Sequence, residues 1–297
     1  ACSGTSPGDD TAPIGGEVTD LSAIPHDNMG SILSVTWTQS AAETTWLEFS
    51  VDAGTWLTSP SLEREAASAE EPFFLYFAYP APHAPIIPND EFDGKSKAGP
   101  YGDFVHETDH SIGQLLQALK DSGQAENTLV IFSADNGPEH YAYARDAKFD
   151  HWSAHPFRGL KRDAYEGGHH VPFMVKYPGV TMAGTVNDAL VSQIDIMATL
   201  ASVVGYDLPD KNAAEDSHDL LPLLKGEVKS IRTSHVHNTF DHTWAFREGD
   251  WVLITGKSGH HSRVTKEWLK KHDYPKTESK QARLFNLRED IGQRNDL

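Results

Sequence analysis

The chain has 297 residues, and its 38% hydrophobic content is enough to bury the core of one large domain or of two. Its 43 acidic residues outnumber its 25 basic ones, and the formal net charge of −18 argues against sequence-independent nucleic-acid binding. An anionic substrate would therefore need a local basic pocket or a metal.

The first residues predict a flexible, exported leader. Residues 1–20 are rich in Gly, Pro, Asp and Thr, as flexible tethers are. Cys2 is the only cysteine, so an internal disulfide is excluded. Its setting, Ala-Cys-Ser-Gly before a polar tether, resembles the start of a mature bacterial lipoprotein. We expect a lipid anchor at Cys2 and a periplasmic or outer-surface location, with a free surface thiol as the alternative.

Residues 21–60 predict a β-rich segment of two or three antiparallel strands. Polar and apolar residues alternate from Ser31 to Thr38, and aromatic residues between Thr45 and Leu57 surround an Asp-Ala-Gly turn signal. The segment is too short to form both sheets of a sandwich. Residues 61–71 are polar and predict a linker.

Strands and helices alternate over residues 72–230, which predicts an α/β fold with a mostly parallel sheet flanked by helices. The expected strands are Phe73–Tyr79, the apolar run that starts at Leu129, and Val171–Tyr177. The expected helices have apolar residues at helical spacing from Phe104 to Leu119 and from Ile194 to Val204. Residues 231–297 predict a C-terminal subdomain with a β-hairpin over Trp244–Thr255. No membrane-spanning helix is expected, because no stretch of 18 apolar residues is present.

The apolar run Leu129–Phe132 is followed closely by Asp135-Asn136-Gly137. Uninterrupted apolar strands are typical of parallel sheets that are buried on both faces. Ligands of open α/β sheets bind beyond the carboxyl ends of the strands, and Asp and Asn supply oxygen ligands for Ca²⁺ or Mg²⁺. The alternative is a simple turn, since Asn-Gly is a common turn dipeptide.

Four features follow one another in the α/β region: His83 after the first strand, Asp135-Asn136 after the second, Lys161 in Phe-Arg-Gly-Leu-Lys-Arg, and the block from Tyr165 to Phe173. Together they resemble the type I sulfatases of the alkaline phosphatase superfamily, over roughly residues 72–297. The Arg-x-Gly-Asp-Trp core of the late hairpin and the ending Leu-Phe-Asn-Leu-Arg-Glu-Asp are similar to the small C-terminal antiparallel sheet and the closing segment of these enzymes.

The resemblance implies hydrolysis of sulfate esters with a bound divalent cation, expected to be Ca²⁺. Asp135 and Asn136 would be metal ligands, Lys161 would contact the sulfate, and His83 would hydrogen-bond it or assist the leaving group. A cation and an ammonium group suit this chemistry, because charge on the non-bridging oxygens must be stabilised. Four more residues would line the substrate pocket or hold its loops: Glu139, Arg158, His169 and His170.

The chain also departs from the family pattern. Sulfatases carry a Cys- or Ser-x-Pro-Ser-Arg motif whose first residue becomes the formylglycine nucleophile, and no such motif occurs here. The paired aspartates of the family's first strand and the Lys and His that follow the nucleophile are also missing, because the region before Pro72 reads as an unrelated β-rich segment. We therefore expect an incomplete sulfatase with a weak Ca²⁺ site and no turnover.

Two alternatives stay open. A phosphodiesterase or phosphatase of the same superfamily would share the fold, but it would usually hold two metals with further Asp and His ligands. A non-catalytic lipoprotein that binds sulfated glycans would account for the missing nucleophile motif. In every reading the expected partner is a sulfated small molecule or glycan, or a related anionic ester, and not a nucleic acid.

Overall fold

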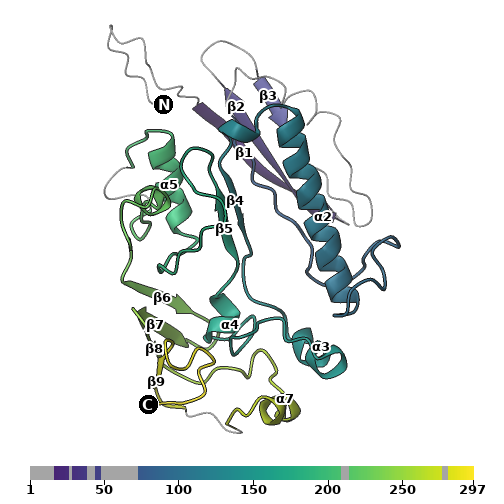
Figure 1. Cartoon of the computed structure of the whole chain (residues 1–297), viewed down its shortest axis with the longest axis vertical. Helices are drawn as coiled ribbons and strands as arrows, with labels where there is room; N and C mark the ends of the chain where they lie inside the picture. The colour runs from purple at the N-terminus through teal and green to yellow at the C-terminus, as the bar shows by residue number, and fades with distance from the viewer. Residues whose placement is uncertain (1–16, 27–28, 39–43, 48–72, 209–213, 276–279) are drawn as a thin grey trace. The chain divides into compact units, whose positions relative to one another are not determined.

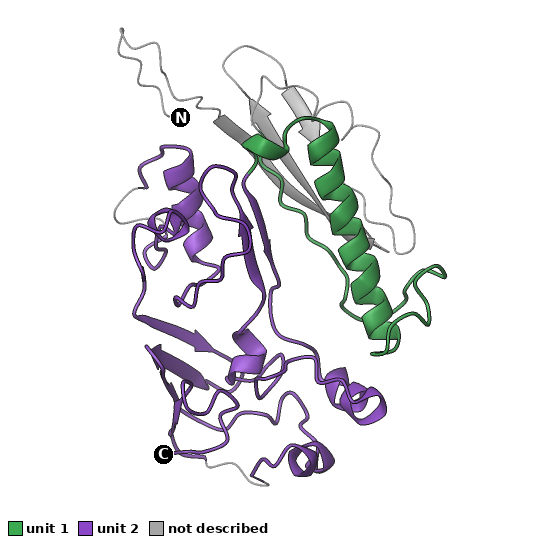
Figure 2. Cartoon of the chain, viewed as in Figure 1, with its two compact units in different colours: residues 1–128 green, residues 129–297 purple. Residues whose placement is uncertain are grey.

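The computed structural model describes residues 17–26, 29–38, 44–47, 73–208, 214–275 and 280–297 (Figure 1). The chain divides into two compact units, residues 1–128 and residues 129–297 (Figure 2). Among the residues that the structure describes, no helix combines the length and the apolar character that a crossing of a lipid bilayer requires.

The structure describes three antiparallel strands in unit 1: β1 (Glu17–His26), β2 (Met29–Thr38) and β3 (Thr44–Leu47), in the order β1-β2-β3. Strands β2 and β3 lie where the sequence pattern predicts strands, whereas no pattern predicted β1. The prediction of a flexible leader over residues 1–20 is wrong for its last four residues, because β1 begins at Glu17 and pairs with β2. Cys2, the Asp-Ala-Gly turn signal and the linker 61–71 lie outside the described residues.

The predicted strand Phe73–Tyr79 is not a strand in the structure. A strand needs a neighbour that accepts and donates its backbone hydrogen bonds, and among the described residues none pairs with this segment. The segment continues into the loop that carries His83, and that loop leads towards helix α2.

Helix α2 (Pro100–Asp121) confirms the predicted helix, with Pro100 in its first turn and Gly123, at a φ of 76°, just beyond its end. Its buried positions are polar or glycine, while its apolar residues are half-buried or exposed, and the predicted packing of its apolar face on the sheet stays a prediction. Asp103 accepts hydrogen bonds from the backbone of Gly94 (3.1 Å) and Ser96 (2.5 Å). The helix is thus joined to the loop before it by buried carboxylate contacts.

Unit 2 starts with strand β4 (Val130–Ser133), which confirms the predicted apolar strand before Asp135; the short 3₁₀ helix η1 (Ala125–Asn127) precedes it in unit 1. Strand β5 (Phe173–Lys176) confirms the predicted strand Val171–Tyr177 and pairs with β4. The two run antiparallel, so the predicted parallel sheet is not seen among the described residues. All four residues of β4 are only half-buried, which agrees with a strand that lacks a covered parallel neighbour.

Four helices of unit 2 lie between β4 and the C-terminal sheet along the chain. They are α3 (Tyr141–Phe149), α4 (Glu166–His169), α5 (Asp195–Val203) and α6 (Leu221–Leu224). Helix α5 confirms the predicted helix from Ile194 to Val204. Its first residue, Asp195, is fully buried and forms an ion pair with buried Arg232 at 2.5 Å, which fixes α5 to the segment that enters the C-terminal sheet.

The C-terminal sheet is antiparallel, as predicted, in the order β6-β7-β8-β9. Its strands are β6 (Ser234–Asn238), β7 (Trp244–Glu248), β8 (Trp251–Ile254) and β9 (Arg283–Asn286). Val252 and Ile254 are fully buried, whereas Trp251 and Leu253 are exposed, so the sheet has one core face. Helix α7 (Lys266–Lys271) starts at Thr265, whose hydroxyl accepts from the backbone of Trp268 at 3.1 Å.

Two apolar clusters form the core of unit 2 and flank one loop. Leu160 packs with Tyr143, Trp268 and Tyr274 in the first cluster. In the second, Ala164 and Tyr165 pack with residues of the C-terminal sheet. The loop from Leu160 to Ala164 is therefore fixed at both ends by burial, and it carries Lys161.

Candidate active site

Three motif segments that are separated in sequence meet through backbone hydrogen bonds in unit 2. Gly137 donates to the carbonyl of Gly168 (3.0 Å), Lys161 donates to the carbonyl of Pro138 (2.8 Å), and Gly167 donates to the carbonyl of Arg158 (2.8 Å). The bonds join the loop after β4, the loop before α4 and α4 itself. The structure thereby brings Asp135-Asn136, Lys161 and His169-His170 into one region.

Glycine is required where these segments cross. A Cβ atom on Gly137 would overlap the carbonyl oxygen of Gly167. On Gly167 a Cβ would overlap the carbonyl oxygen of Gly159 and lie 2.6 Å from that of Arg158. The close approach of backbone to backbone is possible only without side chains.

Lys161 lies in a tight loop whose shape is set by Asp163. The fully buried carboxylate of Asp163 accepts from the backbone of Leu160 at 2.8 Å and from the hydroxyl of Ser258 at 3.3 Å. Lys161 itself is half-buried, and among the described residues its ammonium has no hydrogen-bond or ion-pair partner. A fixed backbone with an uncommitted cation is what contact with an anionic group requires.

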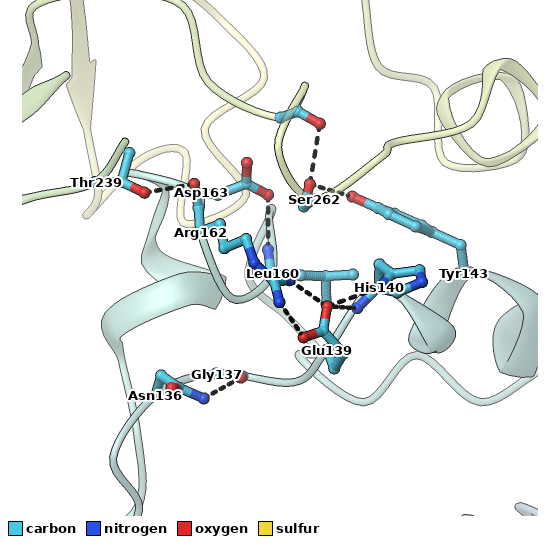
Figure 3. Close-up of polar contacts among 11 residues, drawn as sticks. Asn136, Gly137, Glu139, His140, Tyr143, Leu160, Arg162, Asp163, Thr239 and Ser262 are labelled. Atoms are coloured by element: carbon cyan, nitrogen blue, oxygen red, sulfur yellow. Dashed lines mark hydrogen bonds and ion pairs between the residues drawn. The ribbon is translucent and has the colours of Figure 1, made fainter. Parts of the chain in front are cut away.

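Asp135 and Asn136 follow β4 with their oxygens available. Asp135 is exposed, and its carboxylate has no partner in the part of the chain that the structure describes. Asn136 donates its amide nitrogen to the carbonyl of Gly137 at 3.0 Å (Figure 3), which leaves the amide oxygen to accept or to bind a cation. The two side chains therefore fit two positions in the oxygen shell of a hard divalent cation.

Glu139 forms an ion pair with Arg162 through two hydrogen bonds, one of which is 2.6 Å long (Figure 3). The same carboxylate accepts from the backbone N–H (2.8 Å) and the ring of His140 (2.7 Å). Burial alone would raise the pKa of Glu139, but the hydrogen bonds from Arg162 and His140 outweigh it and lower the pKa to about 2. The carboxylate is thus committed to holding Arg162, and a substrate contact of Glu139 stays a prediction.

Arg158 is buried between the loop of Lys161 and the C-terminal segment. Its side chain is 4% exposed and lies over the ring of Tyr165, 4.1 Å from the centroid, and near the ring of Tyr274. Its guanidinium donates to the carbonyl of Gln293 at 3.0 Å. Stacking on these rings and burial keep the charge away from solvent, and the residue fastens the C-terminal segment. A substrate contact of Arg158 stays a prediction.

His169 and His170 differ in their surroundings. The ring of His169 lies tilted against that of His237, 3.9 Å between centroids, and partial burial together with the nearby His237 lowers the pKa of His169 to about 4. His170 contacts the carboxylate of Glu166 at 2.9 Å and stacks on Phe157. His169 is thus favoured in its neutral form, whereas His170 has a carboxylate partner.

His83 is exposed in unit 1. Its backbone N–H donates to the carbonyl of Pro80 at 3.0 Å, and its ring Nδ1 lies 2.7 Å from the carbonyl of Ala84. The Nε2 atom of the ring has no hydrogen-bond partner among the described residues. Its expected place beside the sulfate stays a prediction.

The arrangement matches a known family. The family model described as Sulfatase matches residues 31–206, which is more than half of the chain. The chain belongs to the sulfatase family. A second family model, described as the C-terminal part of N-sulphoglucosamine sulphohydrolase, matches residues 158–294. The first match begins inside the segment 21–60, so the separate origin that the sequence predicts for that segment stays a prediction.

Relatives of this sulfatase-family chain carry sulfatase names. It is 32% identical over 235 residues to N-acetylgalactosamine-6-O-sulfatase from Bacteroides thetaiotaomicron, a match that covers 77% of this chain and 45% of that protein. It is 39% identical over 173 residues to human arylsulfatase A, covering 58% of this chain and 32% of the relative. The chain therefore spans less than half of the length of these two relatives.

A solved structure supports the fold of this family member. The structure comes from a study of glycosaminoglycan metabolism by Bacteroides thetaiotaomicron, and it superposes with a TM-score of 0.63 at 30% identity. The superposition covers 79% of this chain and 49% of that one. The chain thus shares the sulfatase, or alkaline phosphatase-like, fold, as the sequence predicted.

Sequence reasoning missed one group of side chains in this sulfatase-family chain. Asp241, His260 and His261 bring three possible metal-ligating atoms within 4.8 Å of one another. The adjacent histidines were visible in the sequence, but Asp241 has no local signal that would have joined it to them. Only the packing of two distant loops reveals the group.

Proposed function

We propose that this protein is a sulfate-ester-binding member of the arylsulfatase-like sulfuric ester hydrolases, and that it is incomplete as a hydrolase because these 297 residues contain no formylglycine motif. The observation that carries the proposal is the juxtaposition of Asp135-Asn136 with the loop of Lys161, through the hydrogen bond between Lys161 and Pro138. An anion-contacting ammonium and two oxygen ligands on joined loops suit an ester whose reaction develops negative charge on non-bridging oxygens.

Ca²⁺ is the proposed cofactor, in a family that is generally metal-dependent. Asp135 and the amide oxygen of Asn136 would hold it, and the bound cation would supply electrostatic stabilisation of the sulfate oxygens. Two ligands are few compared with the roughly six to eight oxygens that Ca²⁺ takes. We therefore expect weak Ca²⁺ binding by these residues alone.

The roles of the other residues follow from their positions. Lys161 would bind a sulfate oxygen, since its ammonium is uncommitted among the described residues while its backbone is fixed. Arg162 would stay paired with Glu139 and hold the loop. By the family resemblance, and not from its position, His83 would hydrogen-bond the sulfate or assist the leaving group. The neutral ring of His169 would face uncharged parts of the substrate.

A sulfated sugar is the proposed substrate class. The name of the bacterial relative specifies an N-acetylgalactosamine that is sulfated at the 6-position. We take this sugar sulfate as the first ligand to test. Because the 297 residues contain no Cys- or Ser-x-Pro-Ser-Arg motif, we expect this polypeptide to bind the ester without turnover. The missing motif also makes a non-catalytic protein that binds sulfated glycans the second candidate function.

The test separates binding from turnover. Titration calorimetry with Ca²⁺ present would compare N-acetylgalactosamine 6-sulfate with unsulfated N-acetylgalactosamine, and hydrolysis of an aryl sulfate would be followed in parallel. We expect preference for the sulfated sugar, no hydrolysis, and an affinity reduced at least about tenfold by Lys161→Ala, since a charged hydrogen bond contributes about 1.5–3 kcal/mol.

The matched control is Lys225→Ala, which removes an exposed lysine elsewhere in unit 2. Equal affinity for the two sugars, or equal loss in both variants, would contradict sulfate recognition by Lys161. Calcium-dependent hydrolysis would contradict the expected inactivity and would make this polypeptide an enzyme without the usual nucleophile.

Two further proposals concern the whole protein. We propose that β4 and β5 belong to an alkaline phosphatase-like core whose sheet is mostly parallel, because the similarity to a solved sulfatase structure extends over most of the chain. We also propose that the protein is exported and carries a lipid at Cys2, because the sequence Ala-Cys-Ser-Gly followed by a polar tether resembles the lipidation site of bacterial lipoproteins. Mass spectrometry of the N-terminal peptide after expression with a secretion signal would test the lipid.

A further inference from the structure

Two histidines and an aspartate of the C-terminal subdomain converge on one point. The Oδ2 atom of Asp241 lies 3.0 Å from Nε2 of His260 and 2.9 Å from Nε2 of His261. All three possible ligand atoms lie within 4.8 Å of one another. We propose that these three residues bind a divalent transition metal of the Zn²⁺ type, at a site distinct from Asp135 and Asn136.

The donor set decides the class of metal. Two imidazole nitrogens and one carboxylate oxygen are typical ligands of Zn²⁺, whereas Ca²⁺ and Mg²⁺ take oxygen ligands. With metal–ligand distances of about 2.0–2.2 Å, the edges of a tetrahedral site measure roughly 3.3–3.5 Å. The nitrogen–oxygen separations are already within a few tenths of an ångström of this value, so a small movement would accommodate the ion.

The loop that carries the histidines is held by buried hydroxyls on either side of them. Ser258 donates to Asp163 and accepts from the backbone of Ala164 at 2.9 Å. Ser262 is fully buried, donates to the carbonyl of Gly259 at 3.0 Å, and contacts the hydroxyl of Tyr143 (Figure 3). The histidines thus project from a fixed backbone.

The turn that carries Asp241 is fixed in a similar way. Thr239 donates through its hydroxyl to the carbonyl of Arg162 at 2.6 Å (Figure 3), and its backbone N–H donates to the carbonyl of Thr243. Thr243 donates to the carbonyl of Lys257 at 3.2 Å, which joins this turn to the histidine loop. Asp241 has a φ of 58°, a left-handed conformation that Asp tolerates better than most residues. Both halves of the proposed site are therefore held in place by the fold.

The proposed site is open to a further ligand. Side-chain exposure is 66% for Asp241, 38% for His260 and 29% for His261, so an ion can reach all three. Asp241 and His260 also line a pocket of about 370 Å³ that includes Lys257 and Lys280. Three protein ligands with an open fourth position are typical of reactive zinc sites, and the two lysines favour an anionic group as the fourth ligand.

The experiment is a titration of the full chain with Zn²⁺ and, separately, with Co²⁺. We expect one ion per chain in calorimetry and the visible absorption of tetrahedral Co²⁺. His260→Ala and His261→Ala should each weaken binding at least about tenfold, the loss that even an outer-shell change can cause. Asp241→Asn, which keeps the shape of the side chain, should also weaken it.

The matched control is His151→Ala, which removes an exposed histidine of unit 2 outside the cluster and should leave binding unchanged. Zn²⁺ should raise the Tm of the unmodified chain and of this control, and the rise should be lost in the three site variants. Circular dichroism of the metal-free variants checks that they are folded. Absence of binding, or binding that survives the combined replacement of all three residues, would overturn the proposal, and neither result depends on sulfate-ester recognition.

Discussion

Lys161 and Arg162 are neighbouring basic residues with different contacts. Arg162 forms an ion pair with Glu139, whose pKa is lowered to about 2 despite its partial burial. Lys161 has no such partner among the described residues. The pairing neutralises one cation and leaves the other without a counter-charge among the described residues. The dipeptide Lys-Arg in the sequence does not indicate which of the two side chains forms an ion pair.

The protonation of a second residue, His169, can be tested through the pH dependence of stability. Its pKa is lowered to about 4 in the folded protein, whereas an unfolded histidine has a pKa of about 6.5. Unfolding therefore takes up a proton between these values, so the free energy of unfolding should decrease as the pH falls from about 6.5 towards 4. His169→Gln should make this decrease smaller, as measured by urea denaturation at several pH values above about pH 4.5.

His151→Gln is the control for this measurement, because His151 is exposed and has no ring partner among the described residues. The stability of the His151→Gln variant should change with pH as that of the unmodified chain does. An unchanged slope in His169→Gln would show that the ring of His169 titrates normally in the folded state.

At the scale of elements, three segments are held together by glycines and short backbone hydrogen bonds. Gly137, Gly159 and Gly167 allow the loop after β4, the Lys161 loop and α4 to approach within hydrogen-bond distance. The Tyr165–Phe173 block therefore needs its glycines for packing. Arg158, in the neighbouring loop, is buried, and the predicted substrate contacts of Arg158, His169 and His170 stay predictions.

Gly167→Ala tests this packing. The added Cβ would overlap the carbonyl oxygen of Gly159, and backbone cannot move aside as a flexible side chain can. We expect a loss of about 1–3 kcal/mol or more in the free energy of unfolding, as for other overpacked sites. Urea denaturation measures it, and binding of the sulfated sugar should weaken in parallel.

Gly113→Ala is the matched control, because Gly113 lies inside α2 and a Cβ there has no neighbour within 4 Å. This change should stabilise the chain by about 0.5–1 kcal/mol, the difference in helix propensity. If both variants behaved alike, the glycine crossing would not be what holds the Lys161 loop.

At the scale of the whole molecule, the net charge of −18 opposes the approach of a polyanion such as a sulfated glycan. The screening length falls from about 30 Å at 0.01 M salt to about 8 Å at 0.15 M. The association rate with a sulfated polysaccharide should therefore rise over this range, and surface plasmon resonance can follow it. The desulfated polysaccharide is the control and should show no such rise; a rate that falls with salt would mean that a local basic surface dominates the approach.

The sequence by itself determined the family, the strands β4 and β5, helices α2 and α5, and the late hairpin of the C-terminal sheet. These elements have strong local signals: apolar runs of strand length, helical spacing of apolar residues, and turn residues at the right positions. It also indicated the Asp135-Asn136 pair and Lys161, because each stands in a short motif that is recognisable from its immediate neighbours in the chain.

Tertiary structure decided the matters that depend on distant residues. It showed that Phe73–Tyr79 has no strand partner among the described residues, that β4 and β5 pair antiparallel, and that Arg158 is buried between rings. It also brought Asp241 to His260 and His261 across about twenty residues of chain. These features depend on contacts between segments that are apart in the sequence. Local sequence patterns therefore do not predict them.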